Sequence, residues 1–128
     1  MKITIEMIKM CYDYGKLYYL NQIKLKEAKQ EIHNKTKMNM NSCHDYLTNF
    51  KKMLQGKLFT RYMSEIGYKY YLNQIKIDFS HEYFMNALNS FHKHIEYKEK
   101  TSHCTAHMDR EIFLFFINKE NHHESDTC

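Results

Sequence analysis

The 128-residue sequence contains no proline, no tryptophan and only three glycines. Sandwiches of β-strands and α/β folds need more turn residues than this, so the composition argues against both classes. The absence of proline and the scarcity of glycine favour long helices joined by short polar connections. A chain of this length can also bury a core without disulfides or metals. We therefore expect a single all-α domain.

Long apolar segments are missing as well. The longest uninterrupted apolar run is Ile112–Ile117, far shorter than the roughly 20 residues that cross a bilayer. The first residues are interrupted by charge and lack a small-residue cleavage site, so they do not resemble a signal peptide. We expect a cytoplasmic protein with no membrane partner.

Motifs of common catalytic sites are absent too. The sequence has no glycine-rich phosphate loop, no nucleophile elbow and no His-Glu-x-x-His pair. Its acidic residues are scattered, whereas nuclease metal sites need clustered carboxylates or a dedicated histidine-metal hairpin. The prediction is a protein without enzymatic activity or cofactor.

The cysteines and histidines do not form a recognisable framework. Four cysteines lack disulfide spacing, and Cys11 and Cys43 fall on apolar helix faces, which predicts reduced core thiols. Cys104 and His107 would make one pair of zinc ligands, but no second pair matches it. His92 and His94 would point apart on a helix. We expect no metal site, and we interpret His94 as a polar residue at a helix interface.

Charge is distributed unevenly along the chain. Residues 1–62 contain 12 Lys and Arg but only 5 Asp and Glu, whereas residues 63–128 contain 7 basic and 10 acidic side chains. A basic half suggests a surface that meets a polyanion. The alternative interpretation is that these basic residues are ordinary lysines of a protein surface.

Apolar periodicity predicts five or six helices in an orthogonal bundle, over residues 4–20, 26–34, 41–54, 64–77, 80–99 and 108–118. Residues 1–118 would form the domain and 119–128 a frayed tail. Thr4, Ser80 and either Asn41 or Ser42 are the expected N-caps, and Gly56 the left-handed helix end. The heptapeptide Tyr18–Lys24 recurs as Tyr70–Lys76, which we interpret as coincidence because the flanks differ.

The segment from Leu25 to Arg61 carries the functional hypothesis. Residues 41–54 place one apolar stripe on a helix: Cys43, Tyr46, Leu47, Phe50, Met53 and Leu54. Together with the preceding helix, this arrangement is typical of a helix-turn-helix, whose second helix enters the DNA major groove. In the connection after it, Phe59 can fill the core while Arg61 faces outward. The candidate DNA-contacting residues are Asn41, Ser42, His44, Asp45, Thr48, Lys51, Lys52, Lys57, Thr60 and Arg61.

The order of residues across about 3–112 resembles a known domain. The matching residues are Ser42-x-x-Asp45-Tyr46, Asn49-Phe50, Met53, Gly56, Phe59-Thr60-Arg61, Tyr70-Tyr71-Leu72, Asp78-Phe79, Ala87-Leu88, Ser90 and His94-Ile95-x-Tyr97. They are similar to the N-terminal helical domain of some bacterial modification-dependent HNH restriction endonucleases, which cut DNA containing 5-methylcytosine.

This resemblance implies a module that reads duplex DNA and senses modified cytosine. It carries over most directly to Ser42, Asp45, Thr60 and Arg61. The sequence departs from the family where Tyr97-Lys98-Glu99 replaces a Tyr-Tyr-Glu motif. No nuclease domain follows, so the chain would be a stand-alone binder or the remnant of a truncated gene, with a nuclease acting in trans or a homodimer as partner.

One rival hypothesis comes from a different class of protein. A helical interaction module without nucleic-acid binding would dock the aromatic run Ile112–Ile117 on a partner, or use it to form a dimer.

Overall fold

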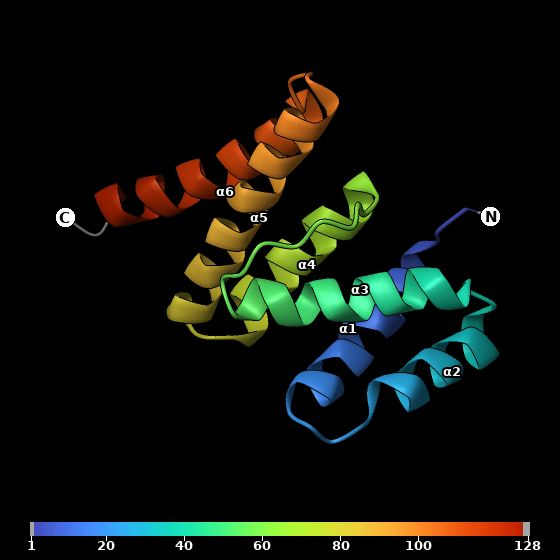
Figure 1. The fold of residues 1–128 in the computed structure, drawn as a ribbon. Coiled ribbons are helices and arrows are strands. Elements are labelled where there is room, and N and C mark those ends of the chain that lie inside the picture. Colours follow the sequence, from blue (N-terminus) through green and yellow to red (C-terminus); the bar gives the residue numbers. More distant parts are fainter. Residues whose placement is uncertain (1, 127–128) are drawn as a thin grey trace.

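A computed structural model describes the backbone of residues 2–126 and the side chains of residues 2–120. Over this range the chain is helical without a strand, as predicted (Figure 1). The six helices are α1 (Ile5–Tyr19), α2 (Leu25–Thr36), α3 (Met40–Leu54), α4 (Glu65–Asp78), α5 (His81–Ser102) and α6 (His107–Asp126).

Three of the six helices begin at hydroxyl caps, and two of these, Thr4 and Ser80, were predicted. The side chains of Thr4, Ser64 and Ser80 accept hydrogen bonds from backbone N–H groups in the first turns of α1, α4 and α5. The cap predicted for α3 was wrong. Asn39, rather than Asn41 or Ser42, caps this helix, because its extended backbone aims Oδ1 at the first free N–H groups.

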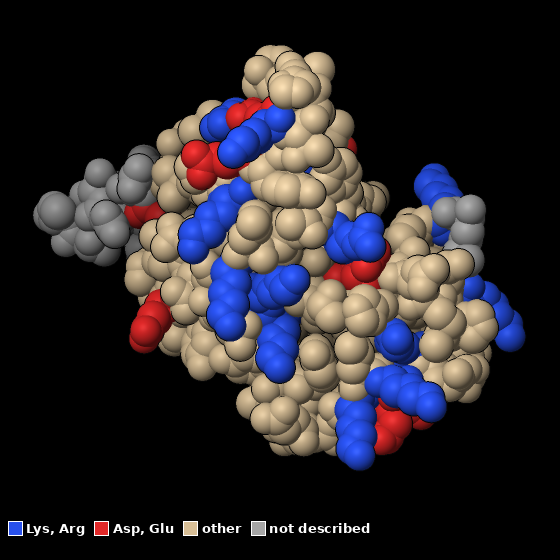
Figure 2. Space-filling model, viewed as in Figure 1, with Lys and Arg blue, Asp and Glu red and all other residues tan. Residues whose placement is uncertain are grey.

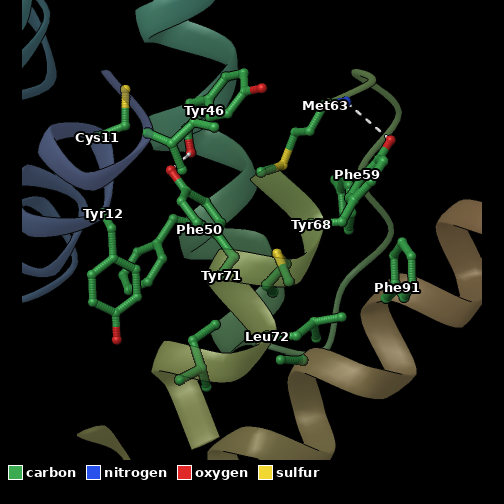
Figure 3. Packing of buried hydrophobic residues seen from close by; sticks show 14 of the residues in the cluster. Cys11, Tyr12, Tyr46, Phe50, Phe59, Met63, Tyr68, Tyr71, Leu72 and Phe91 are labelled. Atoms are coloured by element: carbon green, nitrogen blue, oxygen red, sulfur yellow. Dashed lines mark hydrogen bonds between the residues drawn. The ribbon is translucent and has the colours of Figure 1, made fainter. Parts of the chain in front are cut away.

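α3 is the helix around which the bundle packs. It contacts α1, α2 and α5, and its apolar stripe is buried as predicted. The rings of Tyr12, Phe50 and Tyr71 meet edge-on or tilted in the core (Figure 3), with Phe50 5.1 Å from Tyr12 and 5.6 Å from Tyr71 between centroids. Gly15 lets α1 approach this cluster closely, since a Cβ there would lie 2.9 Å from Cδ2 of Phe50.

The second half of the chain completes the bundle. α4 contacts α1, α5 and α6, so it is packed on several sides. α6 packs on α4 and α5 through Ile112 and Phe116. It continues to Asp126, so the predicted end of this helix at Asn118 was wrong. Residues 127–128 lie outside the described range.

The repeated heptapeptide adopts two structures. At Tyr18–Lys24 the helix ends after Tyr19, and Asn21 takes a left-handed conformation with φ of 60°. At Tyr70–Lys76 the same residues lie entirely within α4. Within residues 2–126, none of the helices combines the length and apolar character needed to cross a bilayer.

The close approach at Gly15 generates a stability prediction. Gly15→Ala should lower the free energy of unfolding by about 1 kcal/mol, because overpacking costs about 1–3 kcal/mol and the better helix propensity of alanine offsets about 1 kcal/mol. Urea unfolding measures this change. Phe50→Leu should reduce the penalty in the double variant, so additive effects of the two substitutions, or a more stable single variant, would contradict the contact.

Candidate nucleic-acid interface

The outer face of α3 lies at the protein surface, opposite the buried stripe. Asn41 and Lys52 are exposed. The remaining predicted contact residues of this helix are partly exposed: Ser42, His44, Asp45, Thr48 and Lys51. Lys57, Thr60 and Arg61, in the connection after the helix, are exposed. The structure therefore brings all ten candidate residues to the surface on α3 and the segment that follows it.

Backbone N–H groups at the N-terminal end of this face are already engaged within the protein. Oδ1 of Asn39 accepts hydrogen bonds from the backbone N–H groups of Asn41 at 2.8 Å and of Ser42 at 3.3 Å. These groups would otherwise be available to a phosphate. At this end of the helix, a ligand could therefore contact the side chains of Asn41 and Ser42 but not their backbone N–H groups.

The middle of the face is polar and partly engaged. The hydroxyl of Thr48 donates to the backbone oxygen of His44 at 2.9 Å, which leaves its methyl group and both lone pairs of its oxygen for other contacts. Nζ of Lys29, from α2, lies 3.5 Å from Nδ1 of His44. A positive charge from the neighbouring helix therefore stands beside the predicted base-facing residues.

One acid interrupts the basic surface. Oδ1 of Asp45 lies 3.7 Å from Nε of Arg61, and the side chain of Arg61 is 73% exposed. An exposed pair at this separation contributes little, typically about 0–1 kcal/mol. Arg61 is therefore free to leave Asp45 for a stronger anion such as a phosphate, and this exchange would release the carboxylate of Asp45.

Four lysines gather around the C-terminal end of α3, and we call them the lysine group. Its members are Lys51, Lys52, Lys57 and, from α5, Lys93. Figure 2 shows basic side chains collected over this end of α3 and the adjacent part of α5. Among residues 2–120 no carboxylate pairs with any of the four. Lys51 and Lys52 also suit the negative end of the α3 dipole.

Two of these lysines are oriented by neighbours other than acids. Nζ of Lys51 lies 5.0 Å from the ring centroid of Tyr18, a cation–π contact that keeps the full charge. Nζ of Lys93 donates to the backbone oxygen of Gly56 at 2.8 Å and so joins α5 to the turn after α3. Gly56 has φ of 70°, as predicted for a left-handed helix end.

The backbone of residues 55–64, the connection, is fixed at several points. Ser90 donates to the backbone oxygen of Lys57, and Asn49 donates to that of Arg61 at 3.0 Å. The backbone N–H of Met63 donates to the hydroxyl of Tyr68 at 2.9 Å (Figure 3). Because both the start and the end of the segment are tied down, its basic side chains project from a defined backbone.

His94 is the central anchor of the connection. Its Nδ1 donates to the backbone oxygen of Phe59 at 2.7 Å, and its Nε2 accepts from the hydroxyl of Tyr68 at 2.7 Å. The ring of Phe59 is buried and stacks on the imidazole, 4.0 Å between centroids. Both predictions for these residues are confirmed: Phe59 fills the core beneath an outward Arg61, and His94 is polar within an interface.

Burial sets the protonation state of His94. It lowers the pKa of the imidazole to about 4, so the ring is neutral at pH 7. The neutral ring fits this geometry, since Nδ1 donates to the Phe59 carbonyl and Nε2 is then an acceptor for the Tyr68 hydroxyl. Burial also raises the pKa of the Tyr68 hydroxyl, which remains protonated and donates to the ring.

Lys29, Asn49 and Lys93 belong to this surface or support it, although the sequence alone did not place them in the site. Lys93 looks like any exposed helix lysine in the sequence, and only the packing of α5 against the connection brings it near Lys57. For Asn49, however, the sequence does contain a pattern that could have indicated its role. Asn49 is a polar residue beside an apolar stripe, and such a residue needs a buried hydrogen-bond partner.

The other candidate chemical groups do not converge. In the part of the chain that the structure describes, no group of three or more His, Cys, Asp or Glu could hold a metal ion. His92 is partly exposed beside Glu96, whereas His94 is buried, so the two point apart as predicted. Cys11 and Cys43 are buried free thiols, and burial raises the pKa of Cys43 to about 11.

Comparison with known proteins identifies no relative. No protein-family model, no curated protein and no solved structure matches the chain.

The protonation of His94 predicts a pH dependence of stability. The unfolded chain binds the imidazole proton near its ordinary pKa of about 6.5 and the folded chain only near 4, so stability falls as the pH drops through this window. The full loss from this residue is about 3 kcal/mol at 1.36 kcal/mol per pKa unit. Urea unfolding of the wild type and His94→Gln measures it: the stability difference between them should shrink from pH 7 to pH 4.

His92→Gln is the matched control for this experiment. Since His92 is partly exposed, its variant should follow the wild-type pH profile. A wild-type advantage over His94→Gln that is equally large at both pH values would show that the proton on His94 does not govern the anchor.

Proposed function

We propose that this protein binds duplex DNA through the outer face of α3 and the connection. The observation that carries the proposal is the lysine group together with Arg61. Of these five cations on α3, α5 and the connection, only Arg61 forms an ion pair within residues 2–120, with Asp45. Cations that neutralise phosphates release condensed counterions, and this release supplies much of the affinity for DNA. Unpaired lysines lose no existing ion pair when they bind.

The two ends of α3 would have different tasks. The lysine group lies at the C-terminal end and in the connection, where it would hold the phosphate backbone. Asn41, Ser42, His44 and Thr48 lie along the N-terminal half, where amide, hydroxyl and imidazole groups can reach base edges. Such a division matches the docking of a recognition helix, whose N-terminal residues contact bases.

Asp45 and Arg61 provide the finer part of the proposal. When Arg61 turns to a phosphate, the carboxylate of Asp45 is free to accept a hydrogen bond from N4 of cytosine. The proposed preference of this surface for 5-methylcytosine is based on the sequence resemblance. Thr60 lies next to Arg61, and its hydroxyl suits a phosphate oxygen. Cleavage forms no part of this role, and any nuclease would act in trans.

Fluorescence anisotropy with a labelled duplex at low salt tests the binding. The wild type should bind, with an affinity that falls steeply as salt increases. In the triple variant Lys51→Gln, Lys52→Gln, Lys57→Gln the slope of log K against log salt should fall by about 0.9 for each phosphate that the protein no longer neutralises. The control variant Lys9→Gln, Lys24→Gln, Lys100→Gln removes equal charge from exposed positions elsewhere and should bind nearly as the wild type does.

Two comparisons sharpen the outcome. Arg61→Ala should weaken binding more than Arg110→Ala, since Arg110 is engaged by Glu99 on α5. Duplexes with and without 5-methylcytosine separate the two parts of the proposal: equal affinity would remove the preference for modified cytosine and leave backbone binding. No binding to either duplex at low salt would overturn the proposed function.

A further inference from the structure

The outer face of α6 and the neighbouring face of α4 leave an apolar surface uncovered. Ile66 on α4 is 55% exposed, and Met108 and Phe115 on α6 are 51% and 59% exposed. Together with Tyr70 they line a groove of about 580 Å³ between the two helices. Contiguous exposed apolar surface of this kind marks an interaction site more often than isolated exposed residues do.

Charges on the outer face of α6 identify what would cover the groove. Glu111 lies one helical turn before Phe115, and Lys119 one turn after it; both are exposed. The three residues follow i, i+4 and i+8, with the aromatic ring at the midpoint. A second copy of α6 that runs antiparallel, with the two-fold axis at Phe115, places each Glu111 opposite Lys119 of the other copy. A parallel pairing would set like charges against each other.

We infer that two copies of this chain form a symmetric dimer through this surface. An isologous interface must be complementary to itself, and the Glu111–Phe115–Lys119 pattern meets this condition. With the axis at Phe115, the Phe115 rings of the two copies would pack against each other at the edge of the grooves that Ile66 and Tyr70 line. Within one chain, Nζ of Lys119 lies 5.6 Å from the ring centroid of Phe115, so the cation already stands at the edge of the apolar surface.

The surface proposed for the dimer is separate from the proposed DNA surface. α6 packs on α4 and α5, away from the outer face of α3 (Figure 1). The dimer therefore leaves the proposed DNA surface open, and the two proposals can fail separately.

Charge reversal tests the pairing without disturbing the core. Size-exclusion chromatography with light scattering, between about 1 and 100 µM, should show the wild type passing from monomer to dimer. Glu111→Lys and Lys119→Glu should each weaken the dimer about tenfold or more, because each creates two like-charge contacts across the axis. The double variant Glu111→Lys, Lys119→Glu should restore the wild-type affinity. Circular dichroism confirms that all variants remain helical.

Apolar variants provide the second arm of the experiment. Phe115→Glu should abolish the dimer, whereas Leu20→Glu, at an exposed apolar position outside the groove, should leave it unchanged. A wild type that stays monomeric over the whole range would overturn the inference. A dimer that tolerates Phe115→Glu, or a double variant that fails to recover, would show that the copies do not pair through α6 in this orientation.

Discussion

The proposed binding surface depends on the contacts that His94 makes with the connection. A single neutral imidazole ties α5 to the backbone of Phe59 and to the hydroxyl of Tyr68 on α4, and it stacks on the Phe59 ring. These contacts hold together three segments that are distant in sequence. No buried side-chain nitrogen or oxygen in the described part of the chain lacks a hydrogen-bond partner. The connection is thus an ordered element, although it contains no regular secondary structure.

α3 combines two roles that are usually assigned to different parts of a protein. Its inner face carries Phe50 and Leu47 into the centre of the core, while its outer face holds the polar residues of the candidate site. Because the inner face is packed on α1 and α5, the outer side chains stand on a rigid support. Rigid presentation reduces the conformational entropy that binding would cost. The surface on α6 differs, since its apolar side chains Met108 and Phe115 are more than half exposed.

The sequence predicted those features that depend on local spacing and failed where distant segments meet. Helix number, the stripe of α3, the caps Thr4 and Ser80 and the inward Phe59 all follow from residues close together in the chain. Two features depend on how the connection crosses α3 and α5, which no local sequence pattern predicts. They are the ion pair of Asp45 with Arg61 and the position of Lys93. The cap of α3 was misplaced because three neighbouring residues are all good caps, and backbone geometry chose Asn39. α6 extends beyond the apolar pattern from which its end was predicted.

The heptapeptide shared by residues 18–24 and 70–76 separates what a short segment encodes from what its surroundings impose. In α4 its second tyrosine, Tyr71, is fully buried and donates to the backbone of Tyr46, whereas the equivalent Tyr19 is only partly buried and shares a hydrogen bond with Tyr83. The same seven residues thus form part of a continuous helix in one place and a turn after a helix end in the other. A synthetic peptide of these seven residues would hold neither conformation, so the tertiary surroundings of each copy decide between the two conformations.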